Sequence, residues 1–315
     1  MESLLSSFGW TLSIITAAGN GFVIFLVAKS RRLHSSANWF VLSLAVADFI
    51  VGIAVFPSSY FCNKQSMACN SRVYMAFFWF FLHSSVTNLC TLTWDRYIAI
   101  VHPLKYDISM TKRHPAMAIL IAWLIPFAIS LSLLVGVYAT TSDTALSVVR
   151  LTGVSAFDLI CCALLFYAVV RILVVARVQS HKEAEETAIQ LQVQFTHSST
   201  DNTNWRRSRN KHNTAPFIFA IVAFFLGCYV VVNYLLLCIT FFCHNLSDKA
   251  GLILILFLVL NSAVNPLVYA FLKKDIKMEI NKIIRRGDQR KKTATDYDRT
   301  LSQTFWILKF NFNHF

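Results

Sequence analysis

The chain has 315 residues, of which 56% are hydrophobic and only 14% are charged, and it carries a formal net charge of +13. This composition is too apolar for an ordinary soluble domain and indicates a protein that resides in a membrane. The sequence contains no HExxH motif and no comparable spacing of metal ligands, so it does not favour an enzyme.

Seven segments are apolar enough to cross a bilayer as helices, because such a helix needs roughly 20 mostly apolar residues. In chain order they cover residues 9–28, 38–58, 72–101, 115–138, 149–176, 215–242 and 250–272. We therefore expect an all-α membrane fold, a bundle of seven transmembrane helices. The odd number of spans argues against the inverted repeats common in secondary transporters.

The distribution of Lys and Arg predicts the orientation of the bundle. Most basic residues fall in the loops of one face and in the tail, whereas the other face has Lys64, Arg72, Arg150 and Lys249. The positive-inside rule then predicts an extracellular amino terminus and a cytoplasmic carboxyl terminus in a multi-pass protein of the plasma membrane. The start, MESLLSSFG, lacks a basic n-region, so we expect the first span to be its own insertion signal. Because the basic residues follow the loops, nucleic acid is not an expected partner.

Five short motifs occur in order on successive spans. They are Gly19-Asn20, the Asp48 that ends LAVAD, the DRY triplet at Asp95-Arg96-Tyr97, Trp123, and NPLVY from Asn265 to Tyr269. Together they resemble the rhodopsin-like (class A) G-protein-coupled receptors across nearly the whole chain. The resemblance implies a receptor that transduces an extracellular ligand signal to a heterotrimeric G protein. A seven-helix channel or transporter without G-protein coupling is the alternative.

The resemblance also implies an activation switch at the end of the third span. In the family, the Arg of DRY is held by the neighbouring Asp at rest and turns toward the G protein on activation; for Arg96 alone, an anchor that snorkels to the interface is the alternative. The implied switch residues are Asp95, Arg96, Tyr97, Tyr167, Phe225, Tyr229, Asn265, Pro266 and Tyr269, and the implied G-protein contacts are Arg96, Pro103 and Leu104. We also expect Tyr106 to hydrogen-bond Asp95.

Asp48 is flanked by apolar residues in mid-span, where a carboxylate must be paired or neutralised. The resemblance implies a sodium site formed by Asp48, Ser85, Asn261, Ser262 and Asn265, with Asn20 and Asn88 nearby. Oxygen ligands around one carboxylate suit Na⁺, which is the one non-protein group we expect. The alternative is hydrogen bonding that holds the helices together.

The sequence departs from the family pattern at several places. The sixth span has Tyr229 where the family has Trp and Val231 where it has Pro, so we expect any hinge to lie near Gly227. The fifth span lacks proline and contains Asp158, which has no assignable partner. In subfamily, the chain is similar to melanocortin-like, adenosine and trace-amine receptors.

The second outer loop contains no Cys, so the usual family disulfide cannot form. We expect a Cys62–Cys69 disulfide first and Cys238–Cys243 second, because sequence does not determine connectivity. The sequon at Asn245 is a candidate glycosylation site.

A ligand pocket is expected near the outer ends of the spans. Amine receptors carry an Asp where this chain has Phe78, which favours an apolar or amphipathic ligand, whether lipid-like, nucleoside or peptide. The candidate lining residues are Phe78, Trp79, Leu82, His83, Val232, Asn233, Leu236, Ile255 and Val259. Simple helix packing is the alternative for these positions, and His83 is expected to pair with Asn233 or with nothing.

The segment after the seventh span has Leu272, Ile276, Ile280 and Ile283 on one helical face and basic residues on the others. This pattern predicts a short amphipathic eighth helix on the lipid surface. We therefore divide the chain into a receptor domain at 1–286 and a disordered cytoplasmic tail at 287–315. The first part of the third inner loop is expected to extend the fifth span.

Overall fold

The structure is a computed structural model that describes residues 2–63, 69–103, 106, 113–139, 151–194, 215–238, 248–286 and 289. The predictions for Leu104, for a Cys238–Cys243 disulfide, for Asn245 and for most of the tail lie outside these residues. The side chain of Leu236 also lies outside them, although its backbone is helical.

Seven long helices coincide with the seven predicted spans. Their bounds are α1 Glu2–Lys29, α2 Ser36–Asn63, α3 Ser71–Val101, α5 Arg113–Ala139, α7 Phe157–Gln194, α9 Ala215–Leu237 and α10 Asp248–Leu272. Two short helical segments, η1 Arg31–Leu33 and the π-helical η2 Leu151–Ala156, precede α2 and α7. In the described residues, six helices are long and apolar enough to span a membrane, and α9 adds the shorter apolar stretch Phe219–Leu235. The all-α seven-helix bundle is thus confirmed.

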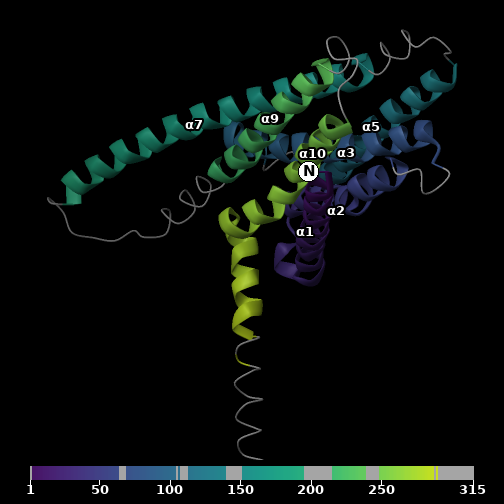
Figure 1. The fold of residues 1–315 in the computed structure, drawn as a ribbon. Coiled ribbons are helices and arrows are strands. Elements are labelled where there is room, and N and C mark those ends of the chain that lie inside the picture. Colours follow the sequence, from purple (N-terminus) through teal and green to yellow (C-terminus); the bar gives the residue numbers. More distant parts are fainter. Residues whose placement is uncertain are drawn as a thin grey trace, which may run out of the picture.

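The helices form a closed ring in which each packs against its neighbours. The order around the ring is α1, α2, α3, α7, α9 and α10, and α10 returns to contact both α1 and α2. Figure 1 shows α9 running alongside the longer α7. Helix α5 packs mainly on α3, on the outside of this ring. Because α3 contacts α2, α5 and α7, its side chains are well placed to join the polar groups of several helices.

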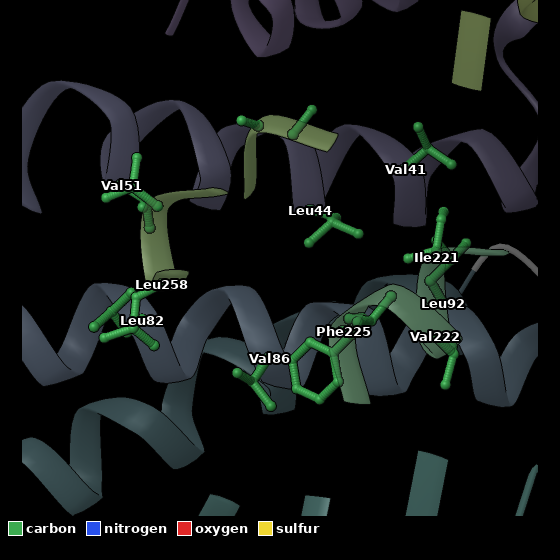
Figure 2. Close-up of a cluster of buried hydrophobic side chains, with 14 of the residues drawn as sticks. Val41, Leu44, Val51, Leu82, Val86, Leu92, Ile221, Val222, Phe225 and Leu258 are labelled. Atoms are coloured by element: carbon green, nitrogen blue, oxygen red, sulfur yellow. The ribbon is translucent and has the colours of Figure 1, made fainter. Parts of the chain in front are cut away.

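Apolar side chains from four of these helices fill the centre of the bundle. Figure 2 shows Leu44 of α2, Leu82 of α3, Phe225 of α9 and Leu258 of α10 pointing into one cluster. All four are almost completely buried. Lipid tails are as apolar as these side chains, so close van der Waals packing is what holds such helices together.

Small residues bring α1 and α2 into backbone contact. A Cβ atom added to Gly52 would lie 2.7 Å from the backbone nitrogen of Ala17 and 3.1 Å from the carbonyl oxygen of Ser13. Neither backbone atom can move aside as a side chain can. Glycine at position 52 is therefore required for this approach of the two helices.

The connection between α2 and α3 is stabilised at both ends. A disulfide joins Cys62 in the last turn of α2 to Cys69, whose Cα atoms are 5.5 Å apart, and this confirms the first expected pairing. The side chain of Asn70 then accepts hydrogen bonds from the backbone amides of Arg72 and Val73, and so caps the first turn of α3.

Two extensions beyond the spans were also predicted correctly. Helix α7 continues to Gln194, well past its apolar part. A further helix covers residues 274–286, in which Ile276 is fully buried and Ile280 packs on the core, while Ile283 is 40% exposed. The buried edge of this eighth helix lies against the bundle.

Candidate functional site

Asp95 and Arg96 form a closed ion pair at the end of α3. The Nε atom of Arg96 lies 2.8 Å from Oδ2 of Asp95, and the Tyr106 hydroxyl donates to Oδ1 of the same carboxylate at 3.2 Å. The Asp95 side chain is 1% exposed and that of Arg96 is 16% exposed. Both carboxylate oxygens are thus occupied, and the guanidinium keeps partial contact with the surface. The half-buried Pro103 follows closely after the end of α3.

Tyr106 is suited to remain a donor in this pair. Burial raises the pKa of Tyr106, and the negative charge of Asp95 acts in the same direction. The phenol therefore stays protonated at neutral pH and keeps its hydrogen bond to the carboxylate.

Four other predicted switch residues are aromatic and make ring contacts on α3, α7 and α9. Tyr97 stacks on Trp94 with ring centroids 5.0 Å apart, and the ring of Tyr167, which is 52% exposed, lies 6.3 Å from that of Tyr97. In α9, the buried rings of Phe225 and Tyr229 stack at 4.2 Å. Tyr229 occupies the position of the expected Trp, so an aromatic pair is kept there.

Asp48 lies at the centre of a fully buried polar cluster between α2, α3 and α10. The Ser85 hydroxyl donates to Oδ1 of Asp48 at 2.6 Å, and the Asn265 amide donates to Oδ2 at 2.7 Å. The Ser262 side chain also interacts with this carboxylate. Asn261 is buried on α10 but makes no hydrogen bond to Asp48. The structure therefore brings together four of the five predicted residues.

The chemistry of this cluster fits a hard monovalent cation. The carboxylate of Asp48 and the hydroxyls of Ser85 and Ser262 supply oxygen atoms, which are the ligands that such ions prefer. Asn20 donates to the carbonyl of Ser262 at 3.2 Å, and its own buried carbonyl oxygen Oδ1 has no hydrogen-bond partner among the described residues. An unpaired buried acceptor beside the cluster indicates room for a bound ion or water.

Asn88 does not belong to the Asp48 cluster, contrary to the prediction. Its carbonyl oxygen accepts from the Ser43 hydroxyl at 2.6 Å, and Ser43 in turn accepts from the indole nitrogen of Trp123 at 3.0 Å. Its amide donates to the carbonyl of Ser84. The rotation of α3 aims this side chain between α2 and α5, so Trp123 has a structural partner in a separate network.

His83 and Asp158 form a buried pair between α3 and α7, and this corrects the expectation that His83 pairs with Asn233. Nε2 of His83 is 3.6 Å from Oδ1 of Asp158, with side-chain exposures of 0% and 1%. The Asn233 amide instead donates to the carbonyl of Tyr229 one turn earlier in α9. Within the part of the chain that the structure describes, the side-chain polar atoms of His83 and Asp158 make no hydrogen bond, so each residue is the other's main polar neighbour there.

The remaining predicted ligand residues are mostly packed in the core. Five of them are buried: Phe78, Leu82, Val232, Ile255 and Val259. Trp79 differs, because it is half-buried and lines a groove between α3, α5 and η2. It also stacks on His83 with ring centroids 5.5 Å apart.

A further polar cluster, which the sequence did not suggest, joins α2 to the start of the eighth helix. The Asn38 amide donates to Oδ2 of Asp275 at 3.0 Å, and Nζ of Lys273 donates to the Asn38 carbonyl oxygen. Burial lowers the pKa of Lys273 to about 8, although the nearby Asp275 acts in the opposite direction. The run of basic residues after the last span is the sequence signal for this cluster, but by itself it predicts a surface that faces lipid.

The chain matches the family "7 transmembrane receptor (rhodopsin family)" over residues 19–269. It belongs to this family. The family and the relatives given below are receptors, which supports a receptor and neither an enzyme nor a channel or transporter. The chain is a class A G-protein-coupled receptor, a multi-pass protein of the plasma membrane whose partners are a heterotrimeric G protein and an extracellular ligand.

Individual relatives resemble the receptor along most of its length. Trace amine-associated receptor 8b of Rattus norvegicus is 26% identical over 302 residues, which cover 87% of this chain and 85% of that protein. Adenosine receptor A2a of Cavia porcellus is 28% identical over 87% of this chain and 71% of its own length. Octopamine receptor beta-2R of Drosophila melanogaster is 26% identical over 84% of this chain, and the match spans 58% of the relative.

Proposed function

We propose that this receptor passes its signal to a G protein by releasing Arg96 from Asp95. The supporting observation is the closed pair, in which the Asp95 carboxylate is shared between the Arg96 guanidinium and the Tyr106 hydroxyl. A carboxylate that is satisfied on both oxygens holds the guanidinium away from an incoming partner. Arg96 keeps 16% of its side chain exposed, so it is reachable once the pair opens.

In this proposal the amino terminus is extracellular and the tail is cytoplasmic. The positive-inside rule supports this orientation, because the basic loops and the basic eighth helix share the face on which Arg96 lies. Epitope tags at the two ends test it directly: antibody should reach the amino-terminal tag in intact cells and the other tag after permeabilisation. The reverse pattern would rule out this orientation.

The buried cluster around Asp48 would hold Na⁺ through the oxygens of Asp48, Ser85 and Ser262. Both Asp48 and Ser85 are almost fully buried, so an ion there would neutralise a carboxylate that is otherwise costly in the bilayer. An ion that binds this arrangement better than a rearranged one stabilises the resting receptor by its difference in affinity.

The ligand in this proposal is apolar or amphipathic. Phe78 stands where amine receptors carry an Asp, so a small ammonium ligand lacks its usual partner. Half-buried Trp79 and the apolar side chains around it favour a ligand with a substantial apolar part.

The test is second-messenger output in cells that express the receptor, challenged with panels of lipids, nucleosides, peptides and amines. Arg96→Ala should abolish the response at equal surface expression, because the guanidinium is the group that engages the G protein. Arg31→Ala removes an exposed positive charge on the same face and should respond like wild type. Normal signalling by Arg96→Ala would refute the proposal.

A further inference from the structure

A groove opens between α3, α5 and η2 at the end of the bundle that the proposed orientation places outside. Its lining includes Arg72, Met75 and Trp79 of α3, Leu133 and Leu134 of α5, and Val154 of η2. The cavity volume is about 130 Å³. Pockets for drug-sized ligands hold roughly 300–1,000 Å³, so this groove suits a slender apolar chain and not a bulky ring system.

Arg72 is the one charged residue among the described residues that line the groove. Its guanidinium lies over the ring of Tyr138, 5.3 Å from the ring centroid. Within the described parts of the chain, no acidic side chain pairs with it. A guanidinium that rests on an aromatic face still directs its N–H groups outward in a planar fork, and this fork matches a carboxylate or a phosphate.

The apolar part of the groove is connected to the buried pair between α3 and α7. Trp79 stacks on His83 with an interplanar angle of 29°, and His83 lies 3.6 Å from Asp158. An occupant that presses on Trp79 therefore acts on the contact that joins these two helices. The groove can therefore hold a ligand, and the contact between Trp79 and His83 couples a bound ligand to the buried core.

We propose that this groove binds an amphiphile with one anionic head group and a single apolar chain. The head group, a carboxylate or a phosphate, pairs with Arg72, and the chain runs along Trp79, Leu133 and Leu134. The proposal rests on the proposed function, since it names the class of ligand for that receptor. The supporting argument is charge complementarity, because Arg72 is the one cation among the described lining residues, and a cation above an apolar lining selects an anionic head in front of an apolar body.

The experiment measures binding of radiolabelled oleate to the full chain in phosphatidylcholine nanodiscs, with empty nanodiscs as background. Unlabelled oleate and oleoyl lysophosphatidate should compete, whereas oleyl alcohol, oleylamine and acetate should compete at least tenfold more weakly. The relative strengths of oleate and oleoyl lysophosphatidate distinguish a carboxylate from a phosphate head group. Equal competition by oleylamine would overturn the proposal.

Variants localise the binding. Arg72→Gln should weaken oleate binding at least tenfold and Arg72→Lys less, while Lys249→Gln, which removes a positive charge from the first turn of α10, should leave binding unchanged. Leu134→Trp fills the groove and should abolish binding with the charge intact. Thermal unfolding midpoints confirm that each variant is folded. Wild-type affinity in both Arg72→Gln and Leu134→Trp would refute the site.

The binding assay contains no G protein, so the two proposals fail separately. Nucleotide exchange that persists in a receptor that binds no oleate would refute the groove and leave the proposed function standing. Oleate binding that depends on Arg72, in a receptor that never promotes nucleotide exchange, would refute the proposed function and leave the groove standing.

Discussion

The buried pair of His83 and Asp158 leads to a quantitative prediction about stability. The two side chains are 3.6 Å apart and at most 1% exposed. Removal of one partner leaves the other buried without its nearest polar neighbour, which typically costs about 1–3 kcal/mol, whereas replacement of both by apolar groups of similar shape is often nearly neutral.

We therefore expect His83→Phe and Asp158→Leu each to destabilise the receptor by about 2 kcal/mol, and the double variant to be more stable than either. At roughly 2–4 °C per kcal/mol, each single change should lower the unfolding midpoint by about 4–8 °C. A thiol-reactive fluorophore reports this transition, because buried cysteines such as Cys161 and Cys228 become accessible on unfolding. The heating rate must be fixed, since unfolding of such proteins is commonly irreversible.

The comparison between single and double variants carries the test. If the losses in free energy of unfolding of the two single variants add in the double variant to within about 0.5 kcal/mol, His83 and Asp158 do not stabilise each other across α3 and α7.

Three further predictions use the same unfolding assay. Sodium at ten times its dissociation constant should stabilise the receptor by about 1.4 kcal/mol relative to choline, and Asp48→Asn should remove this effect; equal sodium dependence in the variant would exclude the site. Gly52→Ala forces a Cβ atom against the backbone of α1 and should lower the free energy of unfolding by about 1–3 kcal/mol. Gly227→Ala, whose Cβ atom would meet nothing within 4 Å, should leave the free energy of unfolding unchanged and should reduce signalling if α9 bends at this position. Lys273 is half-buried with a pKa of about 8, below its ordinary 10.5, so wild-type stability should rise as pH increases from 8 to 10.5, and Lys273→Met should flatten the rise.

The spans and the switch could be predicted from sequence because both depend on local features. About 20 apolar residues partition into a bilayer whatever their neighbours are, so the seven windows predicted the seven helices. Asp95, Arg96 and Tyr106 lie close together along the chain, and the end of α3 brings them together without help from distant segments.

The pairing of helices could not be predicted in the same way. Whether His83 faces α7 or α9, and whether Asn88 faces Asp48 or Trp123, depends on how α3 is rotated in the bundle, and mid-span residues with apolar neighbours give no sign of that rotation. Two ionisable residues within apolar spans were nevertheless a usable signal, because a buried carboxylate needs a partner. The cluster of Asn38 and Lys273 was missed since it forms only where the chain turns back on α2.

The central claim is that Arg96 is held by Asp95 at rest and engages the G protein when released. The most direct measurement is nucleotide exchange on purified heterotrimers of the main G-protein classes, catalysed by the purified receptor in nanodiscs. Asp95→Asn should raise basal exchange above wild type, because it frees the guanidinium, and Arg96→Ala should reduce exchange to the level without receptor. Wild-type exchange by a folded Arg96→Ala receptor would contradict the account.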